Sequence, residues 1–182
     1  MAAQARTLVL GVGNLLMGDE GAGVHLAQRL LAGAELPTGA EVLDGGTGGF
    51  TLLEALTACP RAIIMDACLD GKPPGTLGVK RARRAAHFPT ALGAHDIGVR
   101  ALVEAAELLG ALPRMLLVTI SVQPPFRMGL ELSAPVAAAL PGAERLVRRL
   151  LARGPRAWIG PLSAAPGGRA ERDSPGEARA HA

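Results

Sequence analysis

Two carboxylates follow the first apolar strand of this sequence and are its first candidates for chemistry. The stretch Thr7–Leu10 predicts a buried strand, and the glycine-rich segment after it carries Asp19 and Glu20 just before a helical pattern over Gly23–Leu31. Ligands bind outside the carboxyl ends of the strands in open α/β sheets, so a functional acid would lie here. The alternative is a structural place at the helix N-terminus, where the helix dipole favours negative charge. We favour that structural role for Asp19, whereas the two interpretations are even for Glu20.

Two aspartates end the next two predicted strands. Asp44 follows the strand predicted over Ala40–Leu43, and Asp66 follows the continuous apolar strand predicted over Arg61–Met65. An aspartate before two glycines is typical of a turn in which the side chain bonds its own backbone, so Asp44 also has a structural interpretation. Asp66 is expected to be partly buried with no obvious Lys or Arg beside it, which favours a function.

His95 completes a possible metal site. It precedes the amphipathic helix predicted over Asp96–Leu109, which can begin at the same edge of the sheet. A glutamate, an aspartate and a histidine with open coordination positions suit a divalent ion such as zinc or nickel. The alternative is that His95 only caps its helix. The other histidines, His25, His87 and His181, are expected to be structural or exposed.

The elements that must position these residues alternate between strand and helix. The first three predicted strands are separated by two helical patterns, over Gly23–Leu31 and Phe50–Ala58, which indicates a parallel sheet covered on both faces. Thr76–Arg81 alternates apolar and basic residues and predicts an edge strand that could run antiparallel. Met115–Val122 predicts a further strand, and Ser133 is a plausible N-cap of a last helix that ends near Arg153.

Composition narrows the class of protein. The chain has 182 residues, of which 49% are hydrophobic, and this excludes a disordered protein. We expect one α/β domain over residues 1–154 and a disordered Pro/Gly/Ala/Arg-rich tail over residues 155–182. A net charge of +3 with only 2% aromatic residues is a weak basis for nucleic-acid binding, and we expect none. The sequence has no signal peptide and no apolar run long enough to span a membrane, so we expect a cytoplasmic monomer.

Several common chemistries are not supported. The dinucleotide-binding fingerprint fails because Asn14-Leu15-Leu16 follows Gly11 and Gly13 where a third glycine is required. The sequence contains neither a P-loop nor a GxSxG nucleophile motif. Two cysteines, Cys59 and Cys68, lack metal-binding spacing and are expected to be reduced core residues. A basic cluster is usually a solvated face but could dock an acidic partner; it comprises Lys80, Arg81, Arg83 and Arg84.

Four motifs together resemble those of the hydrogenase maturation proteases. They are GVGNLLMGDEGAGV at residues 11–24, LDGGTGG at 43–49, IIMDA at 63–67 and GAHDIG at 93–98. The likeness keeps the family's order and spacing and runs from about residue 7 to 153. It implies a three-layer α/β/α sandwich around a twisted, mostly parallel five-stranded sheet.

The resemblance also implies an activity. Members of the family are endopeptidases that remove the C-terminal extension of the [NiFe] hydrogenase large-subunit precursor after nickel insertion. Carried over by motif, the nickel-recognising residues are Glu20, Asp66 and His95, and the nickel belongs to the precursor, so no permanently bound cofactor is expected. The LDGGTGG motif carries over Asp44, Gly45 and Thr47 as a flexible loop that takes part in recognition or catalysis.

The mechanism stays open at this level. Nickel could polarise the scissile carbonyl, or a carboxylate could activate water, with Asp66, Glu20 and Asp44 as the candidate catalytic residues. An aspartic-type reaction would make Asp66 the base. The first alternative function is a nickel-dependent checkpoint chaperone that holds the precursor without cleaving it. The second is a nucleotide-binding α/β enzyme, which the missing third glycine already weakens.

Overall fold

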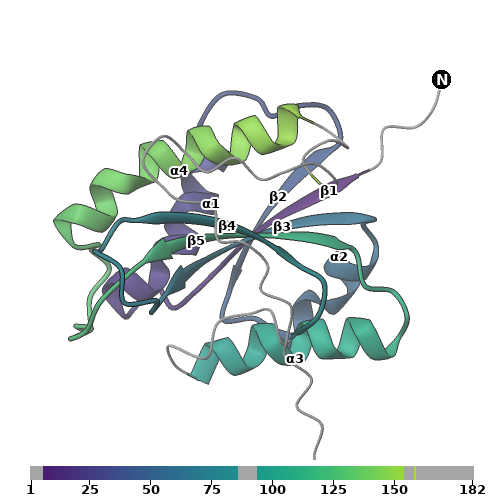
Figure 1. Cartoon of the computed structure of the whole chain (residues 1–182), viewed down its shortest axis with the longest axis horizontal. Coiled ribbons are helices and arrows are strands. Elements are labelled where there is room, and N and C mark those ends of the chain that lie inside the picture. Colours follow the sequence, from purple (N-terminus) through teal and green to yellow (C-terminus); the bar gives the residue numbers. More distant parts are fainter. Residues whose placement is uncertain (1–5, 86–93, 154–157, 159–182) are drawn as a thin grey trace, which may run out of the picture.

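The protein folds into three layers with a five-stranded sheet in the middle (Figure 1). The computed structural model describes residues 6–85, 94–153 and 158, and of residues 94–98 it describes the backbone alone. The strands follow the order β2-β1-β3-β5-β4. Their bounds are Thr7–Val12 for β1, Ala40–Gly46 for β2, Arg61–Cys68 for β3, Leu77–Ala82 for β4 and Arg114–Ser121 for β5.

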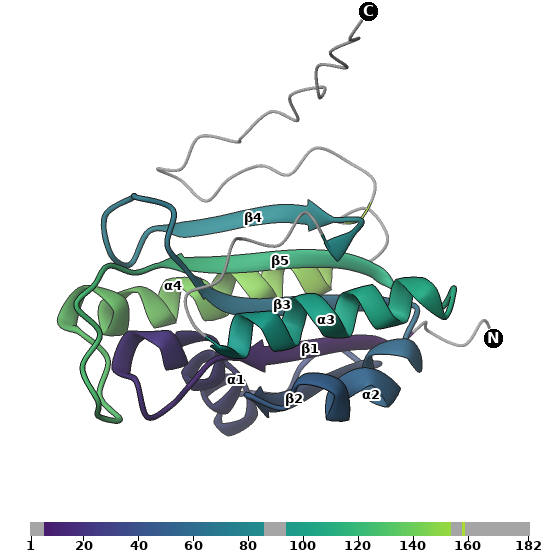
Figure 2. The ribbon, with the colours of Figure 1, turned by 90° about the horizontal axis from the view of Figure 1, so that it is seen from below.

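Helices cover both faces of the sheet. On one face α1 packs beside α4, and on the other α2 and the 3-10 helix η2 pack beside α3 (Figures 1 and 2). The helices are α1 (Ala22–Ala32), α2 (Leu53–Thr57), α3 (Ala94–Leu108) and α4 (Ala134–Ala152), with 3-10 helices η1 (Gly18–Gly21) and η2 (Gly49–Leu52). This arrangement confirms the predicted α/β/α sandwich. None of the described helices is both long and apolar enough to cross a lipid bilayer.

The strand directions also follow the prediction. β1 pairs in parallel with β2 and β3, and β3 pairs in parallel with β5. β4 runs antiparallel to β5 at the edge of the sheet, and its arrow points opposite to that of β1 in Figure 2. The four parallel strands therefore end along one side of the sheet, here called the carboxyl edge, and begin along the other, the amino edge.

Two buried clusters, one on each face, explain why the central strands are continuously apolar. In β1, Leu8 and Leu10 pack toward α2 and α3, whereas Val9 packs toward α1 and α4. The side chains of β3 are divided in the same way: Ile64 packs toward α2 and α3, whereas Ile63 packs toward α1 and α4. A strand that is covered on both faces cannot show the apolar–polar alternation of a half-exposed strand.

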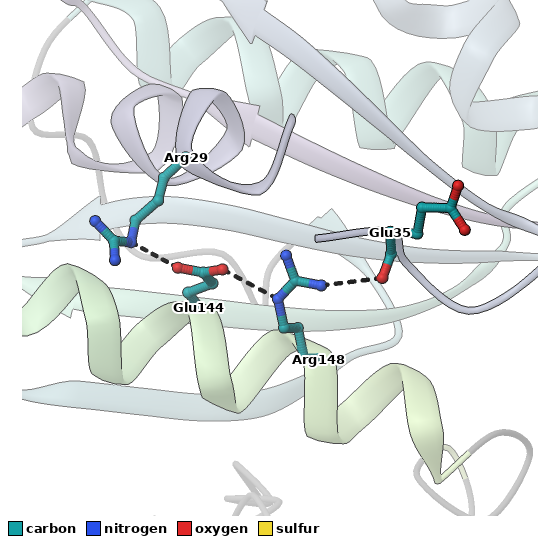
Figure 3. A network of polar contacts seen from close by, with 4 residues as sticks. All are labelled: Arg29, Glu35, Glu144 and Arg148. Atoms are coloured by element: carbon teal, nitrogen blue, oxygen red, sulfur yellow. Dashed lines mark hydrogen bonds and ion pairs between the residues drawn. The ribbon is translucent and has the colours of Figure 1, made fainter. Parts of the chain in front are cut away.

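A polar network joins α1 to α4 at the edge of the buried cluster that lies between these helices and the sheet (Figure 3). Glu144 accepts hydrogen bonds from Arg29 Nε at 2.6 Å and from Arg148 Nε at 3.0 Å. Arg148 Nη1 donates to the carbonyl of Glu35 at 3.3 Å, which adds the loop after α1 to the network. Burial by itself raises the pKa of Glu144, but the hydrogen bonds from Arg148 and Arg29 outweigh it and hold that pKa below its ordinary value.

The end of the described chain returns to the core. Trp158 is buried against the cluster beneath α1 and α4, and the guanidinium of Arg61 lies 6.0 Å from the centre of its ring. An aromatic residue in this part of the chain adds apolar burial to a core otherwise built from aliphatic side chains. The domain boundary predicted after residue 154 stays a prediction, because most of the tail lies outside the described residues.

Candidate functional site

The strand order changes direction at the carboxyl edge between β1 and β3, and the region at these strand ends is here called the crevice. The connection after β1 passes over one face through α1 to reach β2, whereas the chain after β3 continues on the other side, toward β5 and β4. Open α/β sheets bind their ligands where the connections diverge in this way. The sequence-predicted acids must be placed relative to this crevice.

Glu20 lies in η1, the 3-10 helix that follows β1. Its side chain is buried, with the residue 5% exposed, and η1 contacts β3. Gly13 makes this approach possible: its φ is +139°, and a Cβ there would lie 2.1 Å from the backbone oxygen of Glu20. The glycine loop after β1 therefore folds the backbone of η1 directly onto the strand end, beside which the Glu20 side chain is buried.

Asp66 lies inside β3 rather than after it, which corrects the predicted end of that strand at Met65. β3 continues to Cys68 because β5 runs alongside as far as Ser121 and pairs Asp66 with Thr119. Asp66 is 4% exposed, and its Oδ1 accepts a hydrogen bond of 2.8 Å from the N–H of Ala67. The carboxylate is thus fixed on a rigid strand close to the carboxyl edge.

A second glycine brings the segments of Glu20 and Asp66 together. Gly23 lies in the first turn of α1, and a Cβ there would lie 2.2 Å from the carbonyl oxygen of Met65 and 2.4 Å from that of Val12. The start of α1 is therefore pressed against the end of β1 and against Met65 of β3, three residues before that strand ends at Cys68. Because η1 ends where α1 begins, the backbone that carries Glu20 is held next to the residue that precedes Asp66.

Asp44 lies further from β3. It lies inside β2, which continues to Gly46 rather than ending at Leu43 as predicted. It is in register with Gly11 of β1, whose partner on the other side is Met65, so two strand spacings of about 4.8 Å each separate Asp44 from β3. Its exposed carboxylate accepts hydrogen bonds from the N–H of Gly46 at 3.1 Å and from Gln28 Nε2 at 3.0 Å. This is the turn contact that its sequence context indicates, and its catalytic role stays a prediction.

His95 occupies the first turn of α3. Arg114 begins β5 at the amino edge soon after α3 ends at Leu108, so α3 runs back along the sheet and its start lies toward the carboxyl edge (Figure 2). The His95 side chain lies outside the described residues. Among the side chains that are described, no group of three or more His, Cys, Asp and Glu residues could hold a metal ion. The convergence of Glu20, Asp66 and His95 therefore stays a prediction.

Asp19 has the structural role predicted for it. Its Oδ1 accepts a hydrogen bond of 2.7 Å from the backbone N–H of Ser133, the N-cap residue of α4. His25 Nε2 lies 3.0 Å from the carbonyl oxygen of Leu130 and can donate to it. Both contacts hold the segment 130–133, just before α4, against η1 and α1. Ser133 is the N-cap of α4, as predicted.

The cysteines do not supply a nucleophile. Cys59 and Cys68 are both buried and free, as predicted. Burial raises the pKa of both thiols, and it raises that of Cys68 to about 11. A thiol with so high a pKa stays protonated at neutral pH and is a poor nucleophile. The reactive groups of the crevice are therefore carboxylates rather than thiolates.

Comparison with known proteins identifies the family of the chain. Residues 24–150 match the family model HycI, described as hydrogenase maturation protease. The chain is 37% identical over 172 residues to the hydrogenase expression/formation protein HoxM of Azotobacter vinelandii, with 92% of this chain and 80% of HoxM covered. It is also 37% identical over 113 residues to the hydrogenase 2 maturation protease of Escherichia coli K12, with 61% of this chain and 69% of that protein covered.

A solved structure shows the same fold. The hydrogenase-maturating endopeptidase HybD from Escherichia coli superposes with a TM-score of 0.72 at 32% identity, covering 81% of this chain and 91% of HybD. The family model covers the chain from α1 to the last turn of α4, and its description is that of a protease. The chain therefore belongs to the hydrogenase maturation protease family and is an endopeptidase of hydrogenase maturation.

Proposed function

We propose that this protease removes the C-terminal extension of a [NiFe] hydrogenase large-subunit precursor after nickel insertion, and that Glu20, Asp66 and His95 recognise the nickel carried by the precursor. The observation that supports this most is the pair of almost fully buried carboxylates, 5% and 4% exposed, on adjoining segments at the carboxyl edge. The start of α3 at the same edge adds an imidazole to the donor set.

Burial gives the two carboxylates a reason to bind a cation. Removing a carboxylate from water costs free energy that hydrogen bonds and nearby positive charge must offset. Two carboxylates held close together also disfavour each other's ionised form, and a divalent ion relieves both effects. Carboxylate oxygens and an imidazole nitrogen are ligands that nickel accepts. The site is therefore suited to a metal that arrives with the substrate.

Substrate-borne nickel would also explain how the protease distinguishes finished precursors from unfinished ones. A loaded precursor gains the coordination energy of Glu20, Asp66 and His95, whereas an empty one does not, and specificity is this difference in binding free energy. Every 1.4 kcal/mol of the difference changes affinity about tenfold. Coordination by groups on rigid elements also fixes the scissile bond in the crevice, which lowers the entropic part of the barrier.

The carboxylates of the crevice take part in hydrolysis as well. Asp66 would accept a proton from the attacking water as general base, and Glu20 would hold the polypeptide in place through the precursor's nickel. That ion would supply Lewis acidity toward the scissile carbonyl. Asp44, exposed near the carboxyl end of β2, would contact the departing segment.

Processing of nickel-loaded precursor tests the proposal. The purified chain is incubated with loaded and with nickel-free precursor, and mass spectrometry detects loss of the C-terminal peptide. Only the loaded precursor should be cleaved. Glu20→Gln and His95→Ala should abolish cleavage while circular dichroism shows an intact fold.

A matched control lies next to the site. Asp19→Asn removes a negative charge one residue from Glu20 but keeps an oxygen to accept the Ser133 hydrogen bond, so processing should continue at close to the wild-type rate. Full processing by Glu20→Gln and His95→Ala would show that the site assignment is wrong. A stable, uncleaved complex of the wild-type chain with loaded precursor would show that the chain holds this substrate without cutting it.

A further inference from the structure

Exposed apolar side chains are distributed unevenly over the described part of the chain. Eight large hydrophobic residues are exposed there. Five of them lie in connections that follow the carboxyl ends of parallel strands: Leu16, Phe50, Leu69, Met128 and Leu130. The other three lie toward the amino edge, at the ends of α1 and α3: Leu31, Leu108 and Leu109. Apolar surface that collects at one edge marks a binding region more often than single scattered residues do.

Three of these side chains form one surface, here called the apolar lip, made of Leu16, Met128 and Leu130. Met17 and Gly129 form a parallel bridge in which Gly18 N–H donates to the Gly129 carbonyl and Gly129 N–H to the Leu16 carbonyl, each at 2.9 Å. Leu16 precedes one residue of this bridge, and Met128 and Leu130 flank the other, so the bridge brings the three residues together. The three exposed fractions are 61%, 86% and 60% for Leu16, Met128 and Leu130 respectively.

The lip is a fixed part of the fold. The bridge joins the segment before η1 to the segment before α4, and Asp19 and His25 add the hydrogen bonds to Ser133 and Leu130 described above. Ordering an exposed apolar loop in this way costs conformational entropy and leaves hydrophobic surface in water. When a partner covers this fixed apolar surface, the removal of that surface from water contributes favourable free energy to binding.

The position of the lip identifies its partner. Gly18, which is bonded to Gly129, is the first residue of η1, and Glu20 lies two residues further on. The chain is an endopeptidase, so a polypeptide must lie across the crevice at Glu20, and its continuation on this side meets the lip. The surface is apolar, and its flanking charges, Arg127 and Glu131, are of opposite sign and leave no net charge to attract an ionic partner.

We infer that the apolar lip binds apolar side chains of the precursor segment that flanks the scissile bond. This inference rests on the proposed function, since it takes the large-subunit precursor as the polypeptide in the crevice. The lip increases the affinity for the precursor and fixes which of its residues lies at the site of cleavage, whereas the contacts to nickel make binding depend on the presence of the metal. The two contributions are separable because they lie on different residues.

Kinetics with serine substitutions test the lip. Leu16→Ser, Met128→Ser and Leu130→Ser should each raise KM for the loaded precursor several-fold, and all three together about 100-fold, with kcat at saturation near the wild-type value. Leu108→Ser is the matched control, because this residue is 90% exposed and lies at the amino edge; its KM should be unchanged. Thermal unfolding should be unaffected in all these variants, since the side chains are exposed.

Binding of the precursor, measured by surface plasmon resonance, separates this inference from the proposed reaction. A wild-type chain that binds without cleaving would refute the reaction, yet the lip would still be supported if the triple variant lost about 100-fold in affinity and Leu108→Ser lost none. Equal affinities of the wild-type chain and the triple variant would overturn the lip. So would a wild-type chain that fails to bind the precursor, or one that self-associates through the lip in sedimentation while precursor affinity stays unchanged.

Discussion

Gly23→Ala is a direct way to separate the two buried carboxylates without touching either. Gly23 lies in the first turn of α1, where alanine is the better helix former by about 1 kcal/mol. The added Cβ would lie 2.2 Å from the Met65 carbonyl oxygen and 2.4 Å from that of Val12. Both neighbours are backbone atoms of the sheet, so they cannot rotate away as a side chain would.

The expected shift follows from these contacts. Real Cβ atoms essentially never approach a neighbour closer than 3.0 Å, so relieving the 2.2 Å contact moves α1 from β3 by about 0.8 Å. Overpacking of this kind costs about 1–3 kcal/mol, and the gain in helix propensity offsets about 1 kcal/mol of it. A net loss near 1 kcal/mol would lower Tm by about 2–4 °C in a domain of this size. A misplacement of about 1 Å in a catalytic site costs on the order of 100-fold in rate.

The assay compares processing with stability in the same preparation. Gly23→Ala should cleave loaded precursor about 100-fold more slowly while remaining folded at the assay temperature. Gly142→Ala in α4 is the control, because a Cβ there would meet Leu77 Cδ1 at 3.5 Å and Arg145 Nη2 at 3.9 Å, both ordinary contacts with side chains. That variant should be as stable as the wild-type chain or slightly more so, and should process normally.

Two results would refute the reasoning. Wild-type processing by Gly23→Ala would mean that the contact of the start of α1 with the end of β1 and with Met65 of β3 does not set the position of the site. An equal loss of processing in Gly142→Ala would mean that any stiffening of a helix has this effect, whatever the contact with β3.

Two further predictions concern the contacts that hold the site from outside. Asp19→Ala should destabilise the fold by about 1 kcal/mol in urea unfolding, because it removes the acceptor of the Ser133 N–H. Asp19→Asn keeps an acceptor oxygen and should lose much less stability. Equal losses in the two variants would show that the charge matters and the hydrogen bond does not. Glu144→Gln should cost about 1 kcal/mol at pH 7, because it weakens the network with Arg29 and Arg148. Because the folded pKa of Glu144 is lowered, the stability that its carboxylate contributes is fully present above the unfolded pKa near 4.5 and is lost as the pH falls further. The difference in unfolding free energy between the wild-type chain and Glu144→Gln should therefore vanish in acid. A difference that persists below about pH 3 would contradict this.

Much of the fold was predictable because local patterns determine it. The continuous apolar runs of β1, β3 and β5 and the helical stripes of α1 and α3 required a covered, mostly parallel sheet, and the alternation over 76–81 indicated its antiparallel edge. The family was identifiable because its four motifs stand in order along the chain, and the comparisons confirm it. The turn contact of Asp44 followed from residue type and neighbours alone, whereas the hydrogen bond from Ser133 to Asp19 joins residues 114 positions apart and was not predicted.

The sequence alone therefore determined the fold class, the family and the residue types at the carboxyl edge, since these depend on local periodicity and on short motifs. Only the tertiary structure placed Asp66 inside β3, because the length of that strand depends on pairing with β5, which lies far along the chain. The contact between Gly23 and Met65 and the bridge from Met17 to Gly129 likewise join segments that are distant in sequence. Such contacts form only when the whole sheet is assembled. For this reason the sequence carries no local signal for the contact between the segments of Glu20 and Asp66, or for the apolar lip beside them.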